Sequence, residues 1–250
     1  MVDADDIAVE LRQVTKTFGT RRVLDEVSLS VTRGRSVCIL GRSGTGKSVT
    51  LKHIIGLIRP DSGHVFVGDT DVTTLSGAEL ARVRRQTGFL FQNSALFDSI
   101  SVGENVAFPL RRHTDRPDAL IRAQAMALLA QVGLEDEYDK MPADLSGGMR
   151  KRAALARAIA LGPSILLADE PSAGLDPVTA TEIDQLLVSL KRQSGTTLIV
   201  VTHNIPSARV VGDELVFLHD GKILERGSAA VLDASTHPLV QEFMRAEGSG

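Results

Sequence analysis

Short segments in which apolar and polar residues alternate open the chain and predict β-strands. Residues 7–14 and 27–31 follow this period of two, which places every second side chain on one face of a sheet. The turn-like segment Phe18-Gly19-Thr20 lies between these two strands and joins them. Apolar runs of similar length predict further strands over residues 36–40, 63–68 and 87–91.

The pattern changes between residues 94 and about 160, where few strand signals occur. Residues 117–132 carry apolar side chains at helical spacing. Pro117 lies at the start, where a missing N–H costs nothing, and Gly133 follows the end. A second helix is predicted from Ser146 to about residue 160. This part of the chain is therefore expected to be a mostly helical insert.

Strands return after residue 160 and alternate with a helix. Residues 164–168 and 197–201 are strongly apolar, as central strands of a parallel sheet are, and a helix is predicted between them at 178–192. The expected fold class is therefore α/β, with a parallel sheet that helices cover. Two last strands, at 214–219 and 222–226, flank the hairpin turn Asp220-Gly221.

Composition indicates a globular protein and narrows the classes of ligand. Of the 250 residues, 43% are hydrophobic and 24% are charged, which suits a substantial core. The net charge of -3 argues against nucleic acid as a partner, because phosphate backbones demand clustered positive charge. The single cysteine, Cys38, cannot form an intramolecular disulfide, which favours a cytosolic compartment.

No apolar run of about eighteen residues predicts a membrane span. The acidic segment 1–6 lacks the basic and apolar regions of a signal peptide. We therefore expect that any action at a membrane needs the membrane segments of another subunit.

Residues 41–48 read Gly-Arg-Ser-Gly-Thr-Gly-Lys-Ser and match the full G-x-x-x-x-G-K-[ST] phosphate-binding pattern. The strand before it and the apolar helical spacing over 47–58 supply the strand–loop–helix order that the motif requires. The glycines let successive N–H groups form an anion-binding nest, to which the helix adds its positive N-terminal end. Lys47 can then reach the β- and γ-phosphates, and the Ser48 hydroxyl can ligate Mg²⁺.

Two acids, Asp169 and Glu170, follow the apolar strand Ile165–Ala168. Carboxyl ends of strands are where α/β sheets bind ligands. Asp169 is expected to hold Mg²⁺ directly or through water, and Glu170 to orient and deprotonate an attacking water. The alternative is that these acids lie in a solvated turn after the strand. The presence of a phosphate loop in the same chain favours the metal-binding interpretation.

The segment Leu145–Gly148 (Leu-Ser-Gly-Gly) precedes a helix and resembles a second anion nest, with Ser146 as its N-cap. One nucleotide needs only one such nest, which suggests that the second serves a partner subunit. The alternative is an ordinary capped helix. The basic residues that follow are interpreted as a solvated face of the helix rather than a nucleic-acid patch; they are Arg150, Lys151, Arg152 and Arg157.

Taken in order, these motifs resemble those of ABC-type ATPase domains over nearly the whole chain. The Leu-Ser-Gly-Gly segment is the family's own signature. The matching elements are Gly41–Ser48, Gln92, Leu145–Gly148, Asp169-Glu170, Ala173–Asp176 and His203.

The resemblance implies a P-loop NTPase core with a parallel sheet, an N-terminal antiparallel β subdomain and a helical insert. The whole chain, 1–250, would be a single ABC ATPase domain. Its catalytic core would comprise residues 1–92 and 161–250, and its helical signature subdomain residues 93–160.

The resemblance also implies a mechanism, with ATP and Mg²⁺ as cofactors. Two copies would pair head to tail and hold two ATP molecules, each between the phosphate loop of one copy and Ser146, Gly147 and Gly148 of the other. Phe18 would stack on adenine, Asp176 would communicate across the dimer, and Gln92 would contact Mg²⁺ and the water. His203 would contact the γ-phosphate and order the water. The catalytic residues would be Lys47, Gln92, Glu170 and His203, and the metal-binding residues would be Ser48, Gln92 and Asp169. The nucleotide-binding residues would be Phe18, Gly41, Arg42, Ser43, Gly44, Thr45, Gly46, Lys47, Ser48, Val49, Gln92, Ser146, Gly147, Gly148 and Asp176.

Four positions depart from the family pattern. Val49 replaces a hydroxyl residue that commonly contacts a phosphate, Met149 replaces a common glutamine, and residues 173–174 are Ala-Gly rather than Ser-Ala. None of these changes removes a primary catalytic group, so an active ATPase is expected.

Finer features resemble the ATPase of Mla/Mce-type bacterial lipid transporters, notably the stretches Leu90–Asp98 and Glu104–Arg111. This resemblance implies that the protein moves phospholipid or a related lipid and lies at the cytoplasmic face of the inner membrane. The implied partners are a membrane permease, an MCE-domain protein and, in some systems, a STAS-domain subunit. Residues 93–112 would contact the permease through exposed Leu96 and Phe97, although these two side chains could equally pack within the helical region.

Three alternatives remain open. One is the ATPase of another ABC importer, such as an amino-acid importer, and a second is a cell-division or regulatory ABC ATPase. A third is a soluble ABC ATPase acting on DNA or ribosomes. That class usually carries long coiled coils or two ATPase domains in one chain, and this sequence has neither.

Overall fold

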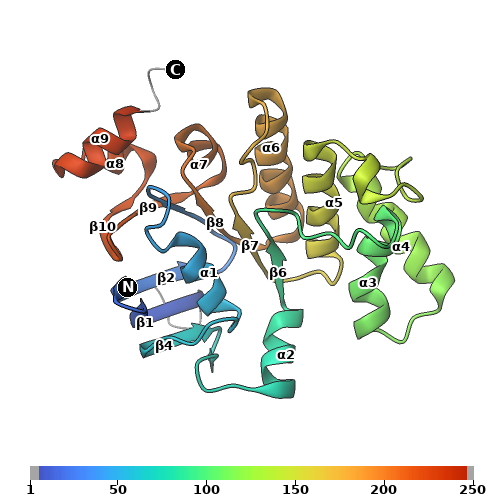
Figure 1. Cartoon of the computed structure of the whole chain (residues 1–250), viewed down its shortest axis with the longest axis horizontal. Helices are drawn as coiled ribbons and strands as arrows, with labels where there is room; N and C mark the ends of the chain where they lie inside the picture. Colours follow the sequence, from blue (N-terminus) through green and yellow to red (C-terminus); the bar gives the residue numbers. More distant parts are fainter. Residues whose placement is uncertain (1–5, 247–250) are drawn as a thin grey trace.

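The computed structural model describes residues 6–246 and contains two sheets flanked by helices (Figure 1). The smaller sheet is antiparallel and has the strand order β2-β1-β4-β5. Its strands are β1 (Ile7–Phe18), β2 (Arg21–Thr32), β4 (Ser62–Val67) and β5 (Thr70–Asp71). The larger sheet has the order β10-β9-β3-β8-β7-β6, with β3 (Ser36–Leu40), β6 (Thr87–Leu90), β7 (Ile165–Asp169), β8 (Thr197–Thr202), β9 (Glu214–His219) and β10 (Lys222–Gly227).

The larger sheet is parallel except at its β9–β10 hairpin. Strands β3, β7 and β8 are buried at every position, which explains why their sequences are apolar throughout rather than alternating. Successive residues of β3 still point to opposite faces. Val37 and Ile39 join the core shared with the antiparallel sheet, whereas Cys38 and Leu40 join the core under the helices of the other face.

Helices from separate parts of the chain cover this sheet. The first core includes α1 (Lys47–Ile54) and a residue of α2 (Gly77–Arg85). The second core packs α5 (Gly147–Ile159), α6 (Pro177–Ser194), α7 (Ile205–Val211), α8 (Ala229–Asp233) and α9 (Pro238–Ala246) on the opposite face.

A third core lies in the helical part of the chain, at the right of Figure 1. It is formed by α3 (Val102–His113), α4 (Asp118–Gln131), α5 and the loop that contains the short 3₁₀ helix η2 (Pro142–Asp144). This separate core supports the division into a catalytic core at 1–92 and 161–250 and a helical subdomain at 93–160, which stays our proposal.

The α/β class, the antiparallel N-terminal sheet and the helical insert are confirmed, and most predicted elements agree with the structure to within a few residues. The first two strands are longer than expected, and Phe18 pairs with Arg21 across the predicted turn. The prediction of a helix over 47–58 is wrong beyond Ile54, because the chain turns at Gly56, whose φ of 62° a helix does not permit. Helix α3 was not predicted as a separate element, since Pro109 lies inside it.

A buried histidine in α1 makes the stability of the fold depend on pH. The Nδ1 atom of His53 donates to the Val49 carbonyl at 2.7 Å, and within the described residues Nε2 has no partner. Protonation would place an N–H on Nε2 with no acceptor, and burial lowers the pKa of His53 below its ordinary value of 6.5.

Because the unfolded chain then binds a proton that the folded chain does not, we expect the free energy of unfolding to fall as pH drops through about 6.5. One such group contributes at most about 1.4 kcal/mol per pH unit. Denaturant titrations from pH 7.5 to 5 would measure the slope. His53→Met is expected to flatten it and His113→Gln, at an exposed site, to leave it unchanged; equal slopes in all three proteins would contradict this explanation.

Candidate functional site

The predicted phosphate loop joins the end of β3 to the start of α1. Gly41 and Gly46 have φ values of 156° and 105°, which disfavour any residue with a Cβ atom. A Cβ on Gly41 would lie 2.3 Å from the Leu218 carbonyl oxygen, and one on Gly46 would lie 2.7 Å from that of Val23. Gly46 is also the N-cap of α1 and has no side chain to occupy the first N–H groups of the helix. These groups can therefore bind an anion.

The loops that follow four parallel strands meet at one edge of the large sheet. They are the phosphate loop after β3, the segment that contains Gln92 after β6, Glu170 after β7 and His203 after β8. Parallel strands end at the same edge, so this arrangement follows from the topology. Residues more than 150 positions apart in the sequence thus share one site, as the distances below show.

Charged and polar side chains make direct contacts at this edge. The Ser48 hydroxyl donates to Asp169 Oδ1 at 2.8 Å, and Lys47 Nζ lies 3.6 Å from Glu170 Oε1. The other carboxylate oxygen of Glu170, Oε2, accepts from His203 Nδ1 at 3.0 Å. Lys47 Nζ also donates to the Gly41 carbonyl at 2.7 Å. The cluster therefore contains Gly41, Lys47 and Ser48 of the phosphate-binding motif, the acidic pair Asp169 and Glu170, and His203. All six were predicted site residues.

Burial changes the pKa values of charged groups in this cluster. Desolvation raises the pKa of Asp169, against the hydrogen bond from Ser48, which lowers it. Desolvation also lowers the pKa of Lys47, while the charge of Glu170 raises it. Lys47 and Glu170 attract one another more strongly at this depth than they would in water, because few water molecules screen their charges.

Glu170 has a strained backbone, with a φ of 47°. Its N–H donates to the Val201 carbonyl of β8 at 2.9 Å, and its carbonyl accepts from Ala173. The neighbouring strand thus holds a left-handed conformation that a non-glycine residue rarely adopts. Strain of this kind is often found at functional sites, where surrounding contacts fix the side chain.

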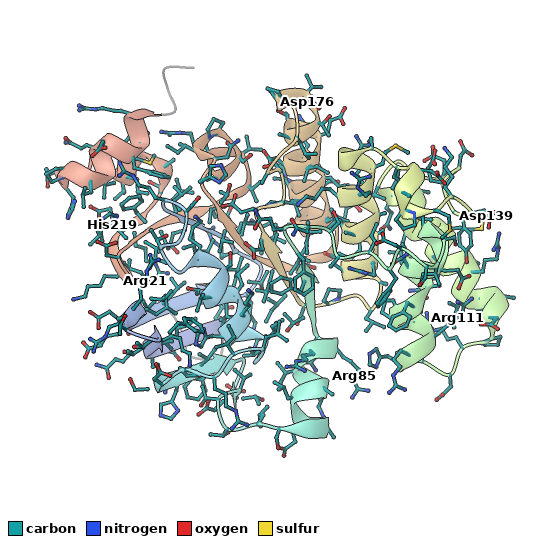
Figure 2. The ribbon with its side chains drawn as sticks, in the orientation of Figure 1. Arg21, Arg85, Arg111, Asp139, Asp176 and His219 are labelled. Atoms are coloured by element: carbon teal, nitrogen blue, oxygen red, sulfur yellow. The ribbon has the colours of Figure 1, made fainter. Side chains whose placement is uncertain are left out.

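The other predicted site residues lie at the periphery. Phe18 is 46% exposed, at the tip of the β1–β2 hairpin, with Lys16 Nζ 5.5 Å from the centre of its ring. Gln92 is exposed. Asp176 is the N-cap of α6, accepts from the N–H groups of Val178 and Thr179, and lies at the exposed end of that helix (Figure 2).

The second predicted nest does not join the first within one chain. Ser146 caps α5 by accepting from the Met149 N–H at 3.2 Å, as expected. Helix α5 lies across β7 from α1 (Figure 1), and the signature glycines adjoin Leu175 and Thr179 rather than the phosphate loop. Within one copy of the chain, the phosphate loop and the signature segment are therefore separate sites.

The interpretation of the basic residues after the signature as a solvated face is wrong for Lys151. This side chain is buried, 5% exposed, and Nζ donates to the backbone carbonyls of Gln92 and Glu170. Arg157 is half-buried and donates to the Ser94 and Ala95 carbonyls. The burial of Lys151 could have been predicted from the sequence, because Lys151 lies four positions before the buried Leu155 on the same face of the helix.

An aromatic groove of about 360 Å³ lies between the start of the helical part and the catalytic core. The rings of Phe97 and Phe108 lie 5.0 Å apart, and those of Phe89 and Phe91 lie 4.2 Å apart. Phe97 and Phe108 are both exposed. The predicted exposure of Leu96 is wrong, because Leu96 packs against two of the cores. We call the groove lined by Phe89, Phe91, Phe97, Phe108, Arg84, Arg85 and Arg157 the Phe97 groove.

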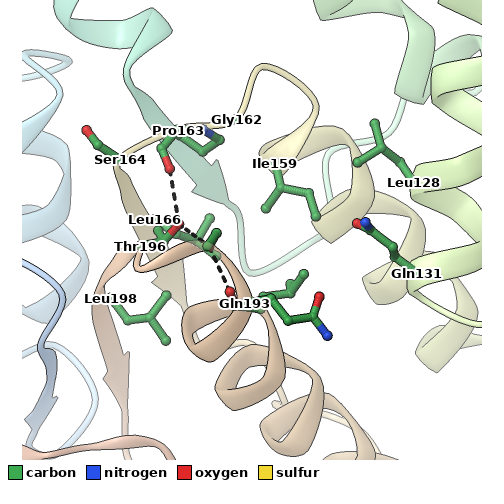
Figure 3. Close-up of a pocket in the computed structure, with 12 residues that line it drawn as sticks. Leu128, Gln131, Ile159, Gly162, Pro163, Ser164, Leu166, Gln193, Thr196 and Leu198 are labelled. Atoms are coloured by element: carbon green, nitrogen blue, oxygen red, sulfur yellow. Dashed lines mark hydrogen bonds between the residues drawn. The ribbon is translucent and has the colours of Figure 1, made fainter.

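Another groove, of about 590 Å³, lies at the opposite edge of the sheet (Figure 3). Residues at the N-terminal ends of β7 and β8 line it, among them Leu166 and Leu198, and Thr196 donates there to the Pro163 carbonyl. Its lining residues carry no charge, so it lacks the chemistry of the cluster around Glu170.

Comparison with known proteins points to one family. The sequence model of the family described as ABC transporter matches residues 24–173. The chain is 41% identical over 236 residues to the intermembrane phospholipid transport system ATP-binding protein MlaF of Escherichia coli, a match that covers 94% of this chain and 88% of MlaF. It is 43% identical over 244 residues to the probable ribonucleotide transport ATP-binding protein mkl of Mycobacterium tuberculosis, covering 98% of this chain and 68% of mkl.

Solved structures show the same fold. A dimeric post-hydrolysis state of the ATP-binding cassette MJ0796 bound to ADP and Pi matches with a TM-score of 0.83 and 36% identity, over 88% of this chain and 98% of that one. CbiO1 from Clostridium perfringens, part of the ABC transporter complex cbiONQ, matches with a TM-score of 0.83 and 28% identity, over 96% of each chain.

Proposed function

This chain belongs to the ABC transporter family, and from that premise we propose that it is the ATP-hydrolysing subunit of a transporter that moves phospholipid or a related lipid between membranes. The cluster of Lys47, Ser48, Asp169, Glu170 and His203 supports the ATPase activity. The lipid is proposed from the extent of the match to MlaF, which spans most of both chains.

The residues present suit a magnesium ion next to the phosphates. Ser48 Oγ and Asp169 Oδ1 are oxygen donors 2.8 Å apart, and hard cations such as Mg²⁺ prefer oxygen. We propose that these two residues, together with Gln92, hold the ion, which neutralises phosphate charge when bound. Mg²⁺ commonly takes only one or two protein ligands beside water and phosphate, so the site needs no larger cluster of acids.

Around the phosphates, we propose that the chain acts by orienting groups. Glu170 orients and deprotonates the attacking water, and its backbone strain and its contact with His203 fix the carboxylate. Lys47 balances the charge that develops on the γ-phosphate, and Gln92 contacts the water from the loop after β6. Such groups contribute by being held in place before the reaction starts.

We propose that two copies pair head to tail and enclose two ATP molecules. In each site, residues 41–49 of one copy would face Ser146, Gly147 and Gly148 of the other. The exposed ring of Phe18 would stack on adenine, and Asp176, at the exposed end of α6, would lie at the junction of the copies. The separation of α1 from α5 within one chain supports this arrangement (Figure 1).

We propose that other subunits supply the membrane-spanning part of the transporter. Within residues 6–246, no helix has the length and apolarity to cross a membrane. We propose that a permease binds the Phe97 groove, which combines exposed aromatic rings with the cationic side chains of Arg84 and Arg85. The further proposed partners are an MCE-domain protein and a STAS-domain subunit, with the assembly at the cytoplasmic face of the inner membrane.

A substitution in this groove is expected to release the permease. Phe97 is 46% exposed, so Phe97→Asp should fold normally while placing a charge where an apolar partner surface docks. Recovery of the permease from detergent-solubilised membranes should fall about tenfold, the effect of about 1.4 kcal/mol. Leu120→Asp, at a position 59% exposed on α4, is the matched control and should retain the permease. Equal recovery with both variants would contradict the assigned docking surface.

The transported class is tested by the same purification with mass spectrometry of proteins and small molecules. Recovery of a permease, an MCE-domain protein and bound phospholipid is the expected result. Recovery of bound ribonucleotide with a different permease would favour the function in the name of mkl. Recovery of ribosomes or DNA-repair proteins with no permease would overturn the transport assignment and keep the ATPase.

A further inference from the structure

The buried ammonium of Lys151 connects two predicted catalytic residues through their backbones. Its Nζ donates to the Glu170 carbonyl at 3.2 Å and to the Gln92 carbonyl. None of the ion pairs formed by the described residues includes Lys151, so these two carbonyls are its hydrogen-bond partners there. One side chain of the signature helix α5 thus spans from the segment after β6 to the segment after β7.

Burial of this cation costs free energy that packing alone does not explain. Desolvation lowers the pKa of Lys151, whereas the charges of Asp169 and Glu170 raise it. A methionine fills a similar volume without the cost of desolvating a charge. The hydrogen bonds that the ammonium donates to the two carbonyls therefore explain its presence better than packing does.

Both segments that Lys151 holds are strained. Glu170 has a φ of 47°, and in the other segment Ser94 and Ala95 have φ values of 60° and 51°. Arg157, also from α5, donates to the carbonyls of Ser94 and Ala95 at 2.9 and 2.7 Å. These left-handed residues lie where cations of α5 bind the backbone, so the conformation of both segments depends on the position of that helix.

We propose that Lys151 is a positioning residue for ATP hydrolysis, which joins the carbonyls of Gln92 and Glu170 and so fixes these two residues relative to each other. This inference rests on the proposed function. Because Lys151 lies on α5, a shift of the helical part of the chain would move Gln92 and the strained backbone of Glu170 together.

Three variants of the full chain test this role in a steady-state ATPase assay. Lys151→Met removes the donors and keeps the length of the side chain, Lys151→Arg restores a cationic donor, and Arg152→Met removes a neighbouring cation of α5 that pairs with Glu182 outside the site. A displacement of catalytic groups by about 1 Å can cost 10²-fold in rate. We expect kcat of Lys151→Met to fall by about 10- to 100-fold while KM for ATP changes less than about threefold.

Lys151→Arg is expected to recover kcat to within about threefold of the wild type, and Arg152→Met to match the wild type. A kcat of Lys151→Met near that of the wild type would overturn the proposal. So would a loss of kcat with a matching loss of ATP affinity and thermal stability that Lys151→Arg does not recover, since a purely structural role predicts that result. If Lys151→Met does not fold, Lys151→Gln replaces it, and failure of both to fold also contradicts a positioning role. Wild-type hydrolysis and its loss in Glu170→Gln report on the ATPase itself in every case.

Discussion

Glu170→Gln is expected to abolish ATP turnover while the protein still binds ATP. The substitution keeps the shape of the side chain but removes the base within reach of His203, whose Nδ1 lies 3.0 Å from Glu170 Oε2. A well-placed general base is commonly worth about 10²- to 10⁴-fold in rate, which sets the expected loss of kcat. Because the nucleotide binds but is not consumed, the head-to-tail dimer should accumulate with ATP. Phosphate release and size-exclusion chromatography with ATP and Mg²⁺ would measure the two effects.

The matched control is Glu182→Gln, which removes an exposed carboxylate of α6 that pairs with Arg152. It should hydrolyse ATP at the wild-type rate and show no trapped dimer. Full ATPase activity in Glu170→Gln would show that Glu170 is not the base.

Lys47→Ala is expected to abolish turnover and, unlike the previous variant, to weaken nucleotide binding. Lys47 Nζ is buried, donates to the carbonyls of Gly41 and Arg42 in the phosphate loop, and lies 3.6 Å from Glu170 Oε1. Its removal takes away a charge-assisted hydrogen bond to phosphate, worth about 1.5–3 kcal/mol. It also leaves the buried carboxylate of Glu170 without its cation. The dissociation constant for ATP should therefore rise by about 10- to 100-fold.

Binding of a fluorescent ATP analogue measures this effect directly. Lys222→Ala, which removes an exposed cation next to Asp25, should bind the analogue as the wild type does. Unchanged affinity in Lys47→Ala would contradict a contact between Lys47 and the phosphates.

The fold was predictable because its central strands carry unusually clear patterns. Buried parallel strands such as β7 and β8 are apolar throughout, and the helices between them have regular spacing. Prediction failed where tertiary structure decides the local conformation. Helix α1 ends early because the chain turns at Gly56 over Leu80, and α3 accommodates Pro109 within a packed helical core. Neither the contact between Gly56 and Leu80 nor the packing around Pro109 can be predicted from the residues next to them in the sequence.

The candidate site was predictable from its motifs, because each requires particular residue types at fixed spacing. The structure adds that Ser48 contacts Asp169 and that Glu170 contacts both Lys47 and His203. It also corrects the interpretation of Lys151, whose charge suggested a solvated position. Which carbonyls bind a lysine depends on how the loops after β6 and β7 come together, and this is set by the register of the sheet rather than by the sequence near Lys151.

We expect ATP hydrolysis by this chain to drive the movement of phospholipid. The most direct test is transfer of labelled phospholipid by the purified complex, reconstituted in vesicles, with either the wild-type chain or Glu170→Gln. We predict transfer that requires ATP and Mg²⁺ with the wild type and none above background with Glu170→Gln. Phospholipid transfer at the same rate without ATP, or ATP hydrolysis that labelled ribonucleotide stimulates and phospholipid does not, would contradict this coupling.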